Sequence, residues 1–273
     1  MDAVNGLLDG YDSGVVYVCC GSDWPKVLQC SLVTLRKYYA GPVTVFTDDA
    51  TKDLEDVCFW QDAELVEVKV DSPNPHYASR HIKTRIMELC PYPLGLFIDA
   101  DTVILCDPMT ALESLRGCDI AMTTETPCPT VGSREYRNNP PDGVATLALC
   151  GAEFPHYHSS TIVFTRTAAT LHLSRLWHGE WLAMADTFAN RRIQDQPALA
   201  RALCRWGGRV GDLPKRYNTR SKVVGCAETG DALADDTVVY SACARNGQYH
   251  RLCADVAGVE LPGHRVRRRG DRY

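Results

Sequence analysis

The sequence predicts an α/β protein, with a mostly parallel sheet flanked by helices and a C-terminal part richer in helix. Segments of strand length alternate with segments of helical periodicity through the first half, as in parallel strands joined by helices. The segment "LGLFI" (94–98) has no polar side chain, as expected of a central strand buried on both faces. Residues 171–206 show helical spacing over a length that suits two or three helices.

The first two predicted strands flank one helix. Residues 14–21 are apolar and end at a glycine, which predicts a buried strand. Residues 24–39 predict a helix, because apolar side chains recur at helical spacing and Pro25 falls in the first turn, where proline is tolerated. The segment "GPVTVFTDD" (41–49) predicts a second strand that ends in two acids.

The next segments continue the alternation. Residues 62–70 predict a strand, and residues 78–90 predict a helix that precedes the central strand. Apolar side chains of this helix are expected inward and basic ones largely outward: Ile82, Ile86 and Leu89 inward, Arg80, Lys83 and Arg85 outward.

After the central strand, residues 107–115 predict a helix with Asp107 as N-cap and Pro108 at its first position. Residues 118–125 predict one more strand. Parallel sheets bind ligands beyond the carboxyl ends of their strands, where Gly21, Asp48 and an acid pair after the central strand are expected.

The second half is less regular. Residues 126–143 are rich in proline, glycine and asparagine and predict a long loop, which could close over a ligand. Residues 158–167 and 238–244 predict strands. The tail 261–273 carries five arginines and is either a solvated end or a contact with an anionic surface.

Composition excludes several classes of protein. The net charge of −5 disfavours a nucleic-acid partner. No apolar run approaches the ~20 residues of a membrane span, and no basic segment precedes an apolar core as in a signal peptide. The 13 cysteines include no CxxC pair, which disfavours a zinc site. Buried reduced thiols and a cytoplasmic location are therefore expected, with Cys19, Cys20, Cys58, Cys90 and Cys106 in apolar runs.

Two carboxylates follow the central strand in "GLFIDADTVILCDP" (95–108). Asp99 and Asp101 lie two residues apart, so an extended chain directs both to the same side. Two such acids repel each other unless a cation lies between them, and hard oxygen ligands suit Mg²⁺ or Mn²⁺. The pair therefore predicts a metal site that also takes substrate phosphate. The plainer alternative is a turn-capping Asp101 and a solvated Asp99.

In this context the sequence resembles the GT-A (Rossmann-like) nucleotide-sugar glycosyltransferases, especially the family 8 type. The acid pair resembles their DxD motif. Four other segments resemble family motifs, and all five occur in the family's order along the chain: 15–49 and 79–89 before the pair, 193–203 and 213–220 after it. The resemblance implies transfer of a sugar, most often from a UDP-sugar, to an acceptor hydroxyl, for example on a glycan. Residues 1–125 would bind the donor, and residues 126–260 of the same domain would bind the acceptor and complete the catalytic site.

The resemblance also implies roles for individual residues. Asp99 and Asp101 would hold Mn²⁺ or Mg²⁺ against the diphosphate. Donor-binding positions would be Val18, Cys19, Cys20, Gly21, Asp48, Arg80, Lys83, Ala100 and His158. Asp195 and Gln196 match the family's Asp-Gln pair at the reacting face of the sugar, and Glu125 is a second candidate catalytic carboxylate. Arg80, Lys83 and Asp195 could instead be ordinary helix residues.

The sequence departs from the family at two places. "YHSSTIVF" (157–164) has His158 and Ser160 where the family has Asn-x-Gly, which leaves the sugar open. The family's C-terminal histidine metal ligand has no counterpart in sequence. Ser241 or Cys243 falls near its position, and His250 could substitute for it. Retention of sugar configuration is expected from family 8, although the residues themselves allow inversion.

Other functions fit parts of the sequence. "DADTV" (99–103) also suits a haloacid-dehalogenase-type phosphatase with Asp99 as nucleophile, and "GDALAD" (230–235) resembles that family's later metal motif. About 100 residues precede the first motif, which is unusual for that family. A nucleotidylyltransferase should have more glycines after the first strand. A catalytically silent sugar-binding protein is the third alternative.

Overall fold

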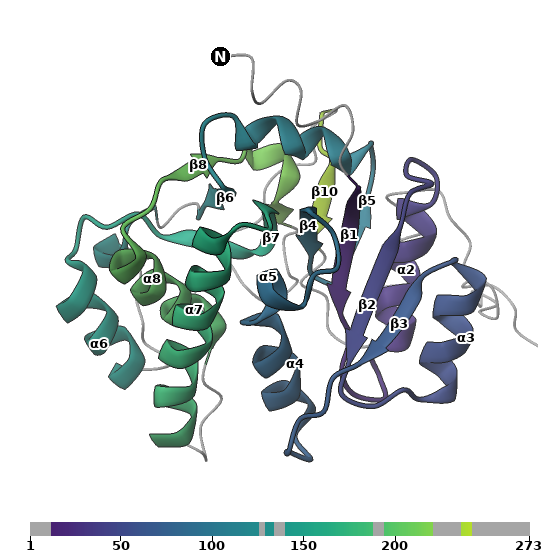
Figure 1. Ribbon diagram of the computed structural model, residues 1–273, viewed down its shortest axis with the longest axis horizontal. Coiled ribbons are helices and arrows are strands. Elements are labelled where there is room, and N and C mark those ends of the chain that lie inside the picture. Colours follow the sequence, from purple (N-terminus) through teal and green to yellow (C-terminus); the bar gives the residue numbers. More distant parts are fainter. Residues whose placement is uncertain (1–11, 126–128, 134–139, 188–193, 221–235, 242–273) are drawn as a thin grey trace, which may run out of the picture.

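The computed structural model describes residues 12–125, 129–133, 140–187, 194–220 and 236–241. A seven-stranded sheet runs through these residues in the order β3-β2-β1-β4-β7-β6-β8 (Figure 1). Its strands are β1 (Ser13–Val18), β2 (Val43–Thr47), β3 (Glu64–Glu67), β4 (Leu94–Ile98), β6 (Ile120–Thr124), β7 (Tyr157–Thr165) and β8 (Val210–Asp212). Six of them are parallel and β7 runs against its neighbours β4 and β6, so the predicted mostly parallel sheet is confirmed.

The reversed strand β7 decides where the polar residues meet. Parallel neighbours β1 and β4 bring their carboxyl ends to one edge of the sheet. Because β7 is antiparallel to β4, it begins at that same edge, where the backbone N–H of Asp99 donates to the carbonyl of Ser160 at 2.8 Å. The end of β4 and the beginning of β7 therefore lie side by side.

Helices cover both faces of the sheet (Figure 1). The helices α2 (Pro25–Leu35), α3 (Lys52–Trp60) and the 3₁₀ helix η1 (Pro108–Leu115) pack on one face. The helices α4 (Pro75–Lys83), α5 (Ile86–Leu89), α7 (Ala168–Thr187) and α8 (Asp195–Trp206) pack on the other, and α6 (Pro140–Cys150) packs against α8. Alternate residues of β1 divide between the two cores, with Val15 and Tyr17 in one and Val16 and Val18 in the other.

A second, three-stranded sheet lies after the central strand. It consists of β5 (Thr102–Ile104), β10 (Val239–Ser241) and β9 (Thr219–Arg220), in that order. The short 3₁₀ helices η2 (Val131–Ser133) and η3 (Lys215–Tyr217) complete the described elements. In η1, Asp107 accepts from the backbone N–H of Met109 and Pro108 takes the first position, as predicted, but the helix is 3₁₀ rather than α. No helix in the described part of the chain is long and apolar enough to cross a membrane.

The predicted helix 78–90 is instead two helices, and its basic face is not solvated. The chain leaves α4 at Thr84, whose hydroxyl donates to the carbonyl of Arg80, and resumes in α5. Lys83 is 8% exposed, so its predicted outward position is wrong. The physical reason is tertiary: the ammonium group is neutralised by carboxylates of other elements, which no helical wheel can indicate.

The predicted loop 126–143 is also shorter than expected. Residues 131–133 form η2 and α6 begins at Pro140, while 126–128 and 134–139 lie outside the described residues. Prolines suit the first turn of a helix, and Asp142 in that turn pairs with the buried Arg201 of α8. The basic tail 261–273 and the segment 230–235 lie outside the description as well.

Most described cysteines are free thiols. Cys19, Cys20, Cys58 and Cys90 are buried as predicted, and Cys106 is half-buried. Burial raises the pKa of Cys58 to about 12 and that of Cys90 to about 11, so these thiols stay protonated and unreactive at neutral pH.

Candidate donor-binding site

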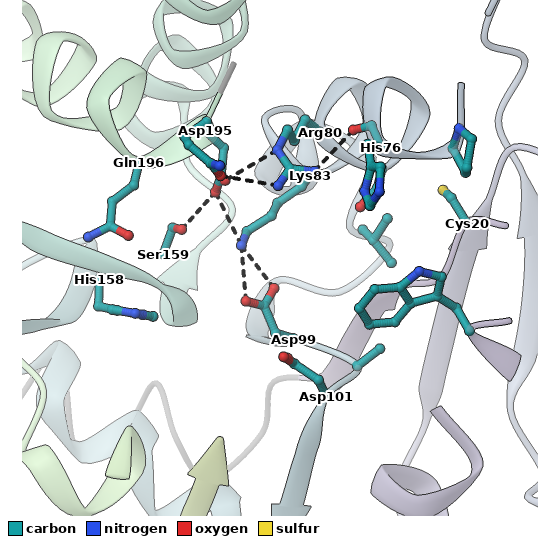
Figure 2. Close-up of a pocket in the computed structure, with 16 residues that line it drawn as sticks. Cys20, His76, Arg80, Lys83, Asp99, Asp101, His158, Ser159, Asp195 and Gln196 are labelled. Carbon is teal, nitrogen blue, oxygen red and sulfur yellow. Dashed lines mark hydrogen bonds and ion pairs between the residues drawn. The ribbon is translucent and has the colours of Figure 1, made fainter. Parts of the chain in front are cut away.

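A cavity of about 250 Å³ opens at the edge of the sheet where β1 and β4 end and β7 begins. Figure 2 shows its polar side chains converging from α4, from the connection after β4, from β7 and from the start of α8. The lining residues are Val18, Cys20, Trp24, Pro75, His76, Ser79, Arg80, Lys83, Asp99, Ala100, Asp101, His158, Ser159, Gln194, Asp195 and Gln196.

Lys83 joins two carboxylates that come from distant parts of the chain. Its Nζ lies 2.9 Å from Oδ1 of Asp99 and 3.2 Å from Oδ2 of Asp195. The side chains of Lys83 and Asp195 are each 10% exposed, whereas that of Asp99 is 28% exposed. The lysine therefore links the end of β4 to the start of α8.

Asp195 has two further partners. The hydroxyl of Ser159 donates to its Oδ2 at 2.7 Å, and Nε of Arg80 lies 3.9 Å from its Oδ1. The guanidinium of Arg80 also donates to the side-chain carbonyl of Gln194 at 3.2 Å and to the backbone carbonyl of His76 at 3.1 Å. Asp195 is thus held as an anion among two cations and a hydroxyl.

These contacts shift the ionisation of the cluster. Burial alone would favour the neutral acid, but Lys83, Arg80 and Ser159 lower the pKa of Asp195 far below its usual value. Burial likewise disfavours the ammonium of Lys83, yet Asp195 and Asp99 raise its pKa. At Asp99 burial dominates and raises the pKa, opposed in part by Lys83. The surroundings therefore shift the pKa values of Asp195 and Asp99 in opposite directions.

Asp99 and Asp101 face the same cavity, although the chain between them bends and is not a continuous strand. Figure 2 shows the carboxylates of both residues pointing into the cavity from the connection between β4 and β5. The predicted convergence of the two acids is therefore observed, with a bend in place of extended backbone.

Gln196 follows Asp195 in α8, and its side-chain amide contacts Glu125 and His156. Its amide Nε2 donates to Oε2 of Glu125 at 2.6 Å and lies 3.1 Å from Nε2 of His156. Nδ1 of His156 lies 2.9 Å from the same oxygen of Glu125. The imidazole is fully buried, and the side chain of Glu125 is 13% exposed.

Ten of the residues predicted for the site line the cavity: Val18, Cys20, Arg80, Lys83, Asp99, Ala100, Asp101, His158, Asp195 and Gln196. Cys19 belongs to the core on the opposite face of β1, because successive strand residues point to opposite sides. Gly21 has φ +90° and packs closely on Pro75, which accounts for a glycine there without a ligand. Asp48 neighbours the thiol of Cys20, and Glu125 lies behind Gln196. His250 and Cys243 lie outside the described residues.

Several lining residues were not predicted. Trp24, Pro75, His76 and Ser79 form one side of the cavity, and Ser159 and Gln194 complete the other. Asn74 caps α4 by accepting from the backbone N–H of His76. An asparagine followed by a proline, as in "SPNP" (72–75), is typical of a helix start, so the sequence could have predicted this one. The burial of His156 beside Gln196 had no signal in the sequence.

The donor set suits a divalent cation held in part by substrate. Asp99 and Asp101 are hard oxygen donors and line the same cavity. Within the described ranges, no group of three or more His, Cys, Asp or Glu side chains could hold a metal. Mg²⁺ and Mn²⁺ are commonly bound by one or two carboxylates together with phosphate oxygens, so the two aspartates fit this mode of binding.

The chain has the GT-A fold of nucleotide-sugar glycosyltransferases, and three solved glycosyltransferase structures are similar to it. It is similar to the galactosyltransferase LgtC in complex with donor and acceptor sugar analogues, with a TM-score of 0.60 and 11% identity, over 88% of this chain and 91% of that one. It is also similar to an active-site mutant of LgtC, with a TM-score of 0.58 and 10% identity, over 92% and 98% of the two chains.

A third similar structure is mouse xyloside xylosyltransferase 1 in its apo form, with a TM-score of 0.56 and 9% identity, over 85% of this chain and 98% of that one. No protein-family model matches the chain, and no curated protein matches its sequence. At such low identity the likeness establishes the fold.

Proposed function

We propose that the protein is a metal-dependent glycosyltransferase that moves a sugar from a nucleotide diphosphate sugar, expected to be UDP-linked, to an acceptor hydroxyl on a glycan. The observation that carries this proposal is the juxtaposition of Asp99 and Asp101 with the Lys83–Asp195 pair around one cavity at the ligand-binding edge of the sheet. The fold and its glycosyltransferase neighbours support the same interpretation.

The donor would lie across the edge of the sheet. Val18 and Cys20 at the end of β1, with Trp24 close by, would contact the base and ribose. Asp99 and Asp101 would hold Mn²⁺ or Mg²⁺, with Ala100 between them against the donor. Such an ion supplies neutralisation of the charge that develops on the leaving nucleotide. Arg80 and Lys83 bring positive charge to the same side and would orient the diphosphate or sugar hydroxyls.

The sugar would then lie against Asp195 and Gln196. Asp195 stays ionised because Lys83, Arg80 and Ser159 stabilise its carboxylate, so it can stabilise positive charge on the sugar in the transition state. His158 stands where family 8 proteins have asparagine and would contact the donor sugar. Glu125 is not among the residues that line the cavity, so it would act on the reaction through its hydrogen bond with Gln196. His250 is kept as a candidate further metal ligand.

The phosphatase interpretation is disfavoured by the fold, which is of the GT-A type. The silent sugar-binding interpretation shares the fold and differs only in turnover. Retention of configuration is a prediction that product analysis would decide.

Calorimetry of UDP with and without Mn²⁺ tests the site. We expect UDP to bind tightly only with the metal, and D99N and D101N to weaken that binding at least 10-fold, because each removes a negative oxygen ligand. D53N on the surface of α3 is the matched control and should bind as the wild type. Unchanged binding in folded D99N and D101N would exclude the metal site.

Turnover separates the competing functions. A thermal-shift screen of UDP-, GDP- and dTDP-sugars with Mn²⁺ would identify the donor, and release of free nucleotide from that donor would establish transferase-type chemistry. Binding without any release of nucleotide would favour the silent protein. Release of phosphate from p-nitrophenyl phosphate, lost in D99N, would favour the phosphatase.

A further inference from the structure

The amide of Gln196 can take only one orientation in its surroundings. Its Nε2 donates to the carboxylate of Glu125 at 2.6 Å and to Nε2 of His156 at 3.1 Å. If the amide were rotated by half a turn, its oxygen would face the carboxylate oxygen of Glu125, and two acceptors would be in contact. The nitrogen therefore faces Glu125 and His156. Figure 2 shows the amide nitrogen of Gln196 turned away from Ser159 and the oxygen on the side of the cavity.

His156 is itself fixed by its neighbours. Its backbone N–H donates to the carbonyl of Pro129 at 2.8 Å, and its backbone carbonyl accepts from the N–H of Glu125 at 2.8 Å. Nδ1 lies 2.9 Å from Oε2 of Glu125. The amide nitrogen of Gln196 only donates, so Nε2 of His156 is the acceptor in their contact at 3.1 Å, and the proton of the neutral imidazole is on Nδ1.

We propose that His156, held by Glu125, is a positioning residue that keeps the carbonyl oxygen of Gln196 directed at the reacting face of the donor sugar. This inference rests on the proposed glycosyltransferase function. The cavity then presents the carbonyl dipole of Gln196 beside the carboxylate of Asp195, and both are negative toward a sugar that gains positive charge. Without His156 the amide of Gln196 loses one of its two acceptors and Glu125 loses the imidazole beside it, so the amide can rotate and present an N–H, which repels that charge.

Two amide variants of His156 separate its contacts. The side-chain oxygen of H156Q reaches the position of Nε2 and can accept from Gln196, whereas the nitrogen of H156N takes the position of Nδ1 and can donate only to Glu125. We expect H156N and H156A to lower kcat for the donor about 10- to 100-fold with KM within about 2-fold, as for loss of a partner that orients a catalytic group. H156Q should recover most of kcat.

The exposed His172 of α7 supplies the control variant H172A, which should behave as the wild type. Equal losses in H156Q, H156N and H156A, in proportion to lost stability, would show a structural role and overturn the proposal. An H156A enzyme with wild-type kcat would overturn it as well.

A second measurement does not depend on activity. In ¹⁵N–¹H spectra the side-chain amide of Gln196, assigned by its loss in Q196A, should show two protons protected from exchange in the wild type, because both are bonded. Rapidly exchanging protons in the wild type would overturn the proposal even if the variants do not fold. If no nucleotide sugar is turned over, the proposed function fails, and this spectrum still decides the orientation of the amide.

Discussion

Asp99 and Asp195 contact the same lysine but lie in different surroundings. Asp195 is 10% exposed in its side chain, forms ion pairs with Lys83 and Arg80, and accepts a hydrogen bond from Ser159. Asp99 is 28% exposed, its side-chain bonds run to Lys83, and it shares the cavity with Asp101. Asp195 is thus held by three partners in the closed part of the pocket, whereas Asp99 lies in its more exposed part, next to Asp101. The proposed function assigns charge stabilisation to the first part and metal binding to the second.

The largest expected effect comes from removing the lysine that joins the two parts. K83M leaves two carboxylates close together in a buried site, so we expect the free energy of unfolding to fall by about 3 kcal/mol or more, as for other broken buried ion pairs. Urea unfolding measures the loss. Turnover of the donor should fall at least 100-fold.

A double variant sharpens this test. K83M/D195N also removes the charge of one of the two carboxylates that lose Lys83, so it should recover part of the stability but not the turnover. K52M is the control, since Lys52 pairs with Asp56 at the surface and should contribute less than about 0.5 kcal/mol. A K83M protein as stable as the wild type would show that the two acids do not depend on Lys83.

An effect of intermediate size is expected for the pH dependence of stability, because of a half-buried histidine between α4 and α7. Nδ1 of His178 in α7 forms a hydrogen bond of 2.8 Å with the hydroxyl of Thr84, and its ring contacts that of His81 edge-on. Burial, with smaller contributions from His81 and Arg85 and opposition from Glu88, lowers the pKa of His178 to about 4. His81 is shifted in the same direction, by burial and Arg85.

The unfolded chain therefore binds more protons than the folded one between pH 6.5 and 4, and stability should fall as the pH drops through that window. Because the imidazole keeps some solvent contact, we expect a loss of about 1–2 kcal/mol rather than the full linkage value. Urea unfolding at several pH values across this window measures it. H178N keeps a nitrogen at the position of Nδ1 and should flatten the dependence. An unchanged slope in H178N would assign the acid sensitivity to other groups.

The smallest expected effect tests whether the position of Lys83 depends on the N-terminal cap of α4, the helix that carries this lysine. Asn74 caps α4 by accepting from the N–H of His76 at 3.0 Å, so N74A should cost about 1 kcal/mol of stability. We expect KM for the donor to change less than about 2-fold, because Lys83 lies at the far end of α4 and is held by its own ion pairs. A large rise in KM without loss of stability would mean that the cap positions the site directly.

The part of the site formed by short stretches of sequence was predictable, and the part formed by packing was not. Asp99, Asp101 and the start of α8 were found because they follow a buried strand or match a known motif. Lys83 was placed outward because a helical wheel counts only neighbours along the helix. Glu125, His156 and Gln196 are far apart in the sequence, and the role proposed for His156 follows from their contacts in the folded chain.

The sequence by itself determined the alternation of strands and helices, the order of motifs and the pair of acids at the end of the central strand, because these depend on local periodicity and on residue type. Tertiary structure alone decided which charges are neutralised. The reversed strand β7 brings Ser160 beside Asp99, and α8 places Asp195 opposite Lys83, over separations that no local pattern spans. Electrostatic pairing depends on distance through space and on burial, and both exist only once the chain has folded.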